Sequence, residues 1–217
     1  MTVRTTDPRS MPQPLAPVQF LSDEQRRASM IRTLSSWQGD HDLWIYAYGS
    51  LIWNPEFDFK ERRLSTLRGH HRALCLWSRV NRGTPDMPGL VFGLDRGGSC
   101  RGMSFRIPAS DVPATFEALW RREMATGAYH PRWLRCETDQ GPVSALAFVI
   151  DRNNPGYVTG LLEHQTVEIV RRASGRYGPC VDYVVQTHQA LQAAGIEDRR
   201  LARLAQRLKE PIAEHTI

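Results

Sequence analysis

The distribution of apolar segments along the chain places the strongest constraint on its fold. Short runs rich in aromatic and β-branched residues, bounded by glycine and proline, occupy the middle of the sequence and are typical of strands. The predicted strands cover residues 43–48, 73–77, 89–94, 102–107, 132–136 and 143–150. Turn signals fall between several of them, at Gly83-Thr84-Pro85, Gly97-Gly98 and Asn154-Pro155-Gly156.

Helical patterns flank this strand-rich region. Ser22 is a good N-cap residue, and a helix is predicted from there to about Trp37, ending near Gly39. Further helices are predicted over residues 110–125, 162–173, 181–194 and 197–208. Because strands and helices do not alternate regularly, the pattern predicts an α+β fold, a curled mixed β-sheet or small β-barrel flanked by helices.

The length of 217 residues and the hydrophobic content of 41% allow one sizeable core. We therefore predict a single domain over residues 41–210. Residues 1–40 are predicted to form an extension, disordered and then helical, and residues 211–217 a short tail. No apolar run is long enough for a signal peptide or a membrane span, so a cytoplasmic protein without membrane contact is expected.

The formal net charge of +5 raises the possibility of an anionic partner. The basic residues are scattered, and the densest group, which includes Arg199, Arg200, Arg203 and Arg207, falls on a predicted helix. No aromatic platform accompanies it. A solvated helix face is therefore favoured over nucleic-acid binding. Nothing in the sequence indicates an oligomeric state.

The cysteines and histidines do not form a recognisable ligand set. Cys75, Cys100, Cys136 and Cys180 stand singly, which predicts reduced, buried thiols rather than disulfides or a zinc site. The histidines include no H-E-x-x-H motif, and the glycines no phosphate-binding loop. Neither a metal nor a cofactor is predicted. A nucleophile–base pair of Cys100 and His71 is conceivable, but no spacing requires it.

One carboxylate stands out on the helix predicted from Ser110. The apolar residues Val112, Phe116, Leu119, Trp120 and Met124 share one face of this helix. Glu123 lies in the middle of that face. A buried carboxylate has a raised pKa and suits a general base near neutral pH. A structural ion pair with an arginine such as Arg72 or Arg82 explains the position equally well, so the helix alone leaves both readings open.

The strand at residues 43–48 runs into a glycine-containing turn, Tyr48-Gly49-Ser50-Leu51. Such a turn can direct successive backbone N–H groups into one concavity, and Gly49 has no Cβ to block a ligand. An ordinary strand-to-loop turn is an equally good explanation of these four residues alone. Ile52 stands where a G-x-S-x-G nucleophile elbow would have its second glycine.

Taken in order, these segments resemble a known family, the ChaC-like γ-glutamylcyclotransferases. The resemblance spans about residues 44–208, and the YGSLIW string with the later Arg-Glu pair is its most specific part. It is carried by Tyr48-Gly49-Ser50-Leu51-Ile52-Trp53-Asn54-Pro55, Arg82-Gly83-Thr84-Pro85, Pro88-Gly89, Gly97-Gly98-Ser99-Cys100, Arg122-Glu123, Asn154-Pro155 with Tyr157, and Gly178-Pro179.

The resemblance implies a function and a set of site residues. It implies that glutathione is cleaved to 5-oxoproline and cysteinylglycine, with Glu123 as the catalytic acid/base. The substrate-binding residues that it implies are Ile45, Tyr46, Ala47, Tyr48, Gly49, Ser50, Leu51, Arg82 and Tyr157. Two alternatives remain open: a cyclotransferase for other γ-glutamyl compounds, and a non-catalytic binding module of the same fold. A binding module would not need an inward carboxylate at Glu123.

Overall fold

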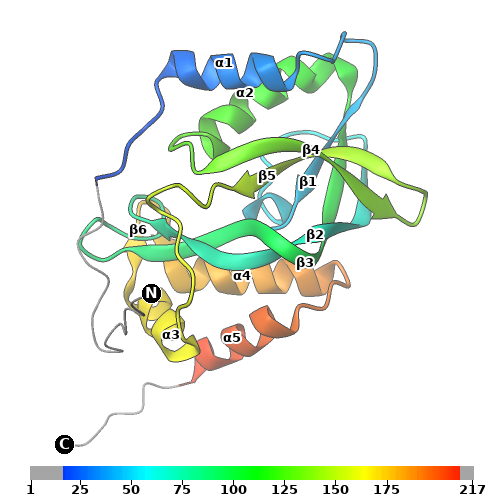
Figure 1. The fold of residues 1–217 in the computed structure, drawn as a ribbon. Coiled ribbons are helices and arrows are strands. Elements are labelled where there is room, and N and C mark those ends of the chain that lie inside the picture. Colours follow the sequence, from blue (N-terminus) through cyan, green and yellow to red (C-terminus); the bar gives the residue numbers. More distant parts are fainter. Residues whose placement is uncertain (1–16, 211–217) are drawn as a thin grey trace, which may run out of the picture.

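A computed structural model describes residues 17–210 of the chain (Figure 1). The predicted disorder at the start of the chain falls on residues 1–16, and the predicted tail on residues 211–217. Both lie outside the described residues.

Five strands form a closed barrel, one of the two forms that the sequence predicted. They are β1 (Leu43–Ala47), β2 (Glu61–Ser78), β3 (Gly89–Ile107), β4 (Tyr129–Thr138) and β5 (Val143–Ile150). Their order in the barrel is β1-β3-β2-β4-β5, mostly antiparallel. A short parallel pairing of β1 with β5, at Trp44↔Ala145 and Ile45↔Leu146, closes it.

Helices cover the barrel on two sides (Figure 1). On one side lie α1 (Asp23–Thr33) and α2 (Val112–Glu123), and on the other α3 (Glu163–Arg172), α4 (Cys180–Ala193) and α5 (Arg199–Lys209). The short elements are the 3₁₀ helices η1 (Ser50–Ile52) and η2 (Ala109–Asp111) and the paired strands β6 (Ser174–Gly175) and β7 (Gly178–Pro179).

The first helix begins as predicted and ends early. Ser22 caps α1 through a capping box in which Gln25 donates its backbone N–H to the Ser22 hydroxyl and accepts from the Ser22 backbone N–H. The helix ends at Thr33 rather than near Trp37. Beyond it, Leu34 and Trp37 turn toward the core beside α2. The last predicted helical turn, residues 34–37, is therefore not helical, and two of its side chains pack on the core instead.

Three of the predicted strands, 73–77, 89–94 and 102–107, were wrong in extent. β2 begins at Glu61, because a half-exposed polar segment pairs with β3 and continues the strand. β3 runs without interruption through Gly97-Gly98, which were predicted to form a turn. Both glycines have positive φ, as does Gly69, where the register of β2 against β3 shifts. The glycines therefore bend two paired strands together instead of ending one of them.

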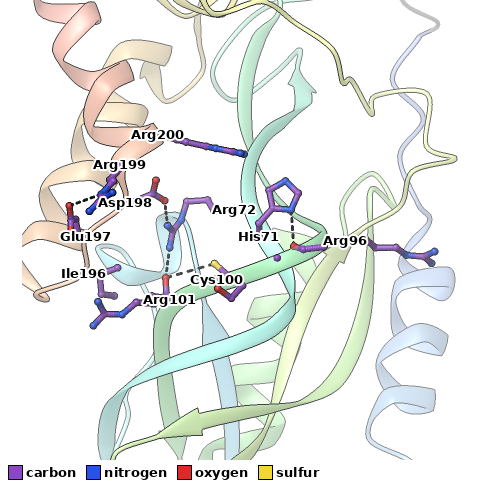
Figure 2. A pocket seen from close by; sticks show the side chains of 13 residues that line it. His71, Arg72, Arg96, Cys100, Arg101, Ile196, Glu197, Asp198, Arg199 and Arg200 are labelled. Atoms are coloured by element: carbon purple, nitrogen blue, oxygen red, sulfur yellow. Dashed lines mark hydrogen bonds and ion pairs between the residues drawn. The ribbon is translucent and has the colours of Figure 1, made fainter.

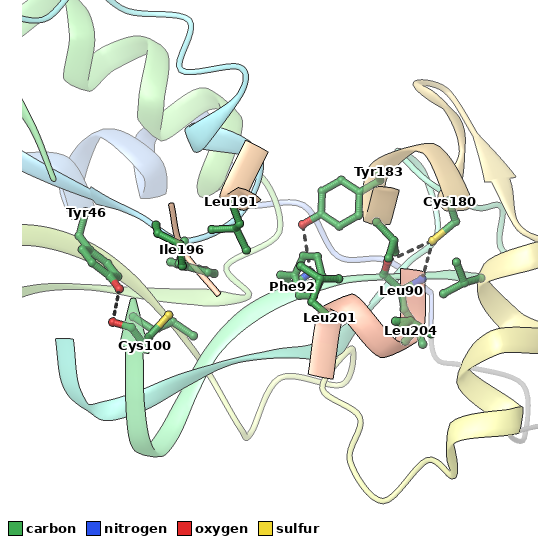
Figure 3. Packing of buried hydrophobic residues seen from close by; sticks show 14 of the residues in the cluster. Tyr46, Leu90, Phe92, Cys100, Cys180, Tyr183, Leu191, Ile196, Leu201 and Leu204 are labelled. Carbon is green, nitrogen blue, oxygen red and sulfur yellow. Dashed lines mark hydrogen bonds between the residues drawn. The ribbon is translucent and has the colours of Figure 1, made fainter. Parts of the chain in front are cut away.

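The core has two main parts, one on each side of the barrel wall. The apolar face predicted for α2 is confirmed: Phe116, Leu119 and Trp120 are buried against Phe105 and Phe148 of the barrel. On the opposite side, residues of α4 and α5 pack on β3 (Figure 3). Because α2 and α4 both pack on the barrel, their positions relative to β1 are fixed.

Candidate active site

The turn after β1 and the end of α2 meet in one narrow pocket. Tyr48, Gly49, Ser50 and Leu51 line it together with Glu123. The remaining lining comes from aromatic residues of the barrel and of α4, namely Phe92, Tyr129, Phe148 and Tyr183. Its volume of about 40 Å³ leaves room for only a few water molecules. The pocket thus combines a carboxylate, a glycine-containing turn and an apolar wall.

Arg122 holds the helix end to the turn. Its Nε lies 3.1 Å from Glu123 Oε1, and its Nη2 donates to Ser50 Oγ at 3.0 Å. Its Nη1 donates to the Asn54 carbonyl at 2.7 Å and lies 3.1 Å from Glu56 Oε2. One guanidinium therefore fixes the spacing between the carboxylate of Glu123 and the turn. The sequence prediction assigned no partner to Arg122 and missed this contact.

The environment of Glu123 suits a base. Its side chain is 17% exposed. Burial raises its pKa above the usual value; the charge of Arg122 opposes that rise and the charge of Glu56 adds to it. The alternative ion pairs with Arg72 or Arg82 do not form, since Arg72 pairs with Asp198 and Arg82 donates to backbone carbonyls. The partner of Glu123 is its neighbour Arg122, which it shares with Glu56.

Three tyrosines line the pocket in different ways. Tyr48 donates its hydroxyl to the Phe148 carbonyl at 2.9 Å, and Tyr129 donates to the Phe92 carbonyl at 3.2 Å. Tyr183 instead accepts the Phe92 backbone N–H at 3.1 Å. Burial raises the pKa of all three hydroxyls, so they are neutral and able to donate. Within residues 17–210 the Tyr183 hydroxyl donates to no protein acceptor, which leaves its hydrogen available to a ligand.

The sequence prediction missed the aromatic wall because barrel closure creates it. Phe92 and Phe148 lay in predicted strands and Tyr183 in a predicted helix, but their common pocket depends on pairings between distant segments. The sequence did offer one indication of Tyr183: the hydroxyl of a buried tyrosine usually forms a hydrogen bond, so a tyrosine in this predicted helix is a candidate for a polar contact.

The other predicted binding residues lie outside the pocket lining. Ile45, Tyr46 and Ala47 are fully buried in β1, and Tyr46 donates its hydroxyl to the Cys100 carbonyl at 2.8 Å. They support the turn that follows them. A direct role for these three residues in substrate binding stays a prediction.

Arg82 and Tyr157 also sit behind the site or away from it. Arg82 donates to the Tyr177 carbonyl at 2.7 Å, and its guanidinium carbon lies 5.5 Å from the ring centre of Tyr183. Tyr157 donates its hydroxyl to Asp95 at 2.9 Å. The contact of Arg82 with Tyr183 can orient the wall of the pocket. Substrate contact by Arg82 or Tyr157 stays a prediction.

The cysteines are buried and unpaired, as predicted. Burial raises the pKa of Cys75 and of Cys136 to about 12, so neither is a thiolate at neutral pH. The disfavoured pair of Cys100 and His71 is not formed: His71 Nδ1 contacts the Gly97 carbonyl, and the Cys100 thiol contacts the Arg101 carbonyl at 3.8 Å. In the part of the chain that the structure describes, no group of three or more His, Cys, Asp or Glu side chains could hold a metal ion.

Solved structures identify the fold as that of a γ-glutamylcyclotransferase. The yeast γ-glutamylcyclotransferase specific to glutathione superposes with a TM-score of 0.74 at 18% identity, over 82% of this chain and 100% of that one. A second crystal structure of the yeast enzyme gives a TM-score of 0.67.

Sequence comparison defines the family more closely. The glutathione-specific γ-glutamylcyclotransferase of Escherichia coli K12 is 36% identical over 89% of this chain and 84% of its own length. Glutathione-specific γ-glutamylcyclotransferase 1 of Mus musculus is 31% identical over 74% of this chain and 75% of its own. The family model described as "ChaC-like protein" matches residues 43–211. The chain therefore belongs to the ChaC-like family, which confirms the resemblance. Over residues 17–210 no helix is long and apolar enough to cross a membrane.

Proposed function

We propose that this chain is a γ-glutamylcyclotransferase that cleaves glutathione to 5-oxoproline and cysteinylglycine. The observation that carries the proposal is the poorly solvated carboxylate of Glu123, which shares one narrow pocket with the turn Tyr48–Leu51. Membership of the ChaC-like family and the glutathione-specific activity named for its relatives support the same reaction.

The reaction needs no nucleophile from the protein. The α-amine of the substrate attacks its own γ-carbonyl carbon, a C–N bond closes the five-membered lactam, and the amide bond to cysteine breaks. Holding a bent conformer for this attack can lower the barrier by up to about 7–11 kcal/mol. Glu123 takes the proton that the α-amine loses and returns it to the leaving nitrogen, a role typically worth about 10²–10⁴ in rate.

The turn supplies donors for the anionic parts of the substrate. Inside the turn, the backbone N–H groups of residues 52–54 donate hydrogen bonds to the carbonyls of Gly49 and Ser50. Within the described structure, the backbone N–H groups of Gly49, Ser50 and Leu51 donate none of the hydrogen bonds of this turn. These groups orient the α-carboxylate of the γ-glutamyl moiety and stabilise negative charge on the γ-carbonyl oxygen.

Tyr183→Phe is expected to weaken substrate binding, because the hydroxyl is the free donor of the aromatic wall. A hydrogen bond to a charged group contributes about 1.5–3 kcal/mol, so KM for glutathione should rise at least about tenfold. The Phe92 N–H also loses its acceptor, so the melting temperature should fall. Tyr177→Phe is the control, since Tyr177 is 60% exposed. An unchanged KM in the Tyr183 variant would remove this hydroxyl from the site.

The function itself is tested by incubating the purified protein with glutathione and measuring products by mass spectrometry. Equal amounts of 5-oxoproline and cysteinylglycine are expected. A parallel series of γ-glutamyl amino acids and γ-glutamylamines tests the alternative substrates. Faster turnover of one of these would reassign the substrate while keeping the reaction. A folded protein that leaves every γ-glutamyl compound intact would be the non-catalytic binding module.

We place the reaction in the cytoplasm, with a small-molecule substrate, no nucleic acid, no metal and no cofactor. The described cysteines are all unpaired, which fits a reducing compartment rich in glutathione. Because the proposed reaction uses no metal, EDTA should leave the rate of glutathione cleavage unchanged.

A further inference from the structure

A second cavity, of about 560 Å³, lies between the bend of β2 and β3 and the start of α5 (Figure 2). It shares no lining residue with the candidate active site. Five arginines and two carboxylates line it, which leaves a formal charge of +3. We refer to it as the arginine-lined cavity.

Both carboxylates of the cavity are already paired. Arg72, whose side chain is only 4% exposed, forms an ion pair with Asp198 and also donates to the carbonyls of Tyr48 and Arg101. Arg199 pairs with Glu197 at 3.3 Å. Arg72 is therefore a fixed part of the floor, and the surplus charge belongs to the other three arginines.

Those three arginines are Arg96, Arg101 and Arg200. Within residues 17–210 none of their side chains forms an ion pair or a hydrogen bond with another protein group, although together they line one hollow. In Figure 2, Arg200 reaches from α5 across to β2 near His71, whereas Arg96 and Arg101 extend to opposite sides. Uncompensated guanidinium groups are thus available at several points around the cavity.

The start of α5 brings one of these arginines to the cavity, since Arg200 lies in the first turn of this eleven-residue helix. The helix N-terminus itself is capped by Asp198, whose carboxylate accepts the Leu201 N–H. The positive charge offered to a ligand therefore comes from the three arginines rather than from the helix end.

We propose that the arginine-lined cavity binds a small polyanion through phosphate groups. The planar guanidinium fork matches phosphate oxygens in pairs, and such charge-assisted hydrogen bonds are stronger than neutral ones. A cavity of this volume is in the range of small-molecule sites. Because the free arginines diverge, a ligand with more than one phosphate fits better than a single phosphate ion. The proposal does not depend on the proposed cyclotransferase activity.

Inorganic pyrophosphate is the probe, titrated into the full-length protein by isothermal calorimetry at physiological salt, where weak long-range attraction is screened. One pyrophosphate per chain is expected. The double variant Arg101→Gln/Arg200→Gln should weaken binding at least tenfold. Arg27→Gln/Arg62→Gln is the matched control: it removes the same charge from two exposed arginines outside the cavity and should change the Kd less than twofold.

Melting temperatures and glutathione cleavage should be the same in both double variants and in the unmodified protein, which would show that the cavity variant is folded. Two results would overturn the proposal. One is the absence of any binding heat in the unmodified protein. The other is equal weakening in both double variants, which would mean that pyrophosphate responds only to net charge.

Discussion

Glu123→Gln is expected to remove nearly all glutathione cleavage while leaving the protein folded. Glutamine keeps the volume of the side chain and can still accept a hydrogen bond from Arg122, but it cannot accept the proton of the α-amine. The kcat should fall by about 10²–10⁴, equivalent to about 2.7–5.4 kcal/mol in the barrier. KM should change little, because the turn Tyr48–Leu51 is untouched.

The melting temperature of Glu123→Gln distinguishes a catalytic base from a structural ion pair. Burial raises the pKa of folded Glu123 above its unfolded value, so its stabilising contribution is present below the unfolded pKa and is lost as pH rises through the folded pKa. At neutral pH the buried carboxylate therefore costs stability, and the neutral amide relieves that cost. Arg122 keeps Glu56 as a partner. The melting temperature should be equal to or above that of the unmodified protein.

Glu117→Gln is the control, since Glu117 is an exposed carboxylate on the same helix. It should match the unmodified protein in both kcat and melting temperature. An active Glu123→Gln protein with a much lower melting temperature would mean that the carboxylate serves structure rather than catalysis.

The pH dependence of kcat/KM should also show that Glu123 acts as a base. Glu123 acts as a base only when ionised, so activity should rise with pH through an apparent pKa above the ordinary glutamate value of 4.5. The profile is measured with initial rates over the acid range in a constant-ionic-strength buffer. This acid limb should be absent from the residual activity of Glu123→Gln.

The parts of the site that follow from local periodicity could be predicted from the sequence. The face of α2 was readable because Phe116, Leu119 and Trp120 recur at helical spacing, which placed Glu123 among them. The turn at Gly49 was readable because an apolar run ends there. Each was ambiguous alone, and only the family resemblance connected them.

The parts that depend on long-range pairing could not be predicted. Glu61–Arg72 is too polar to be recognised as a strand, yet it pairs with β3 and completes the barrel wall. Gly97 and Gly98 have the local signature of a turn, but β3 pairs with β2 on both sides of them, so the strand bends there instead of ending. The contacts of Arg122 could not be predicted either, since its partners Ser50 and Glu56 are remote in sequence.

Gly49→Val is expected to raise KM for glutathione strongly with a smaller effect on kcat. The φ of Gly49 is −133°, outside the left-handed region, so a positive φ does not contribute to the expected effect. A Cβ at this position would lie 3.5 Å from the Tyr183 hydroxyl and 3.7 Å from Phe92 Cβ, which is ordinary contact. The two methyl groups of valine must extend beyond it, into a pocket of about 40 Å³.

Extra methyl volume in a binding pocket typically costs about 1–3 kcal/mol of substrate binding, which corresponds to a rise in KM of about 5- to 150-fold. Gly49→Ala is the matched control, because its Cβ fits within the existing contacts and should change KM only slightly. Steady-state kinetics and the melting temperature of both variants test this expectation. If Gly49→Val binds glutathione with an unaltered KM, the γ-glutamyl group does not approach the chain at this turn, and its carboxylate must be held by other donors of the pocket.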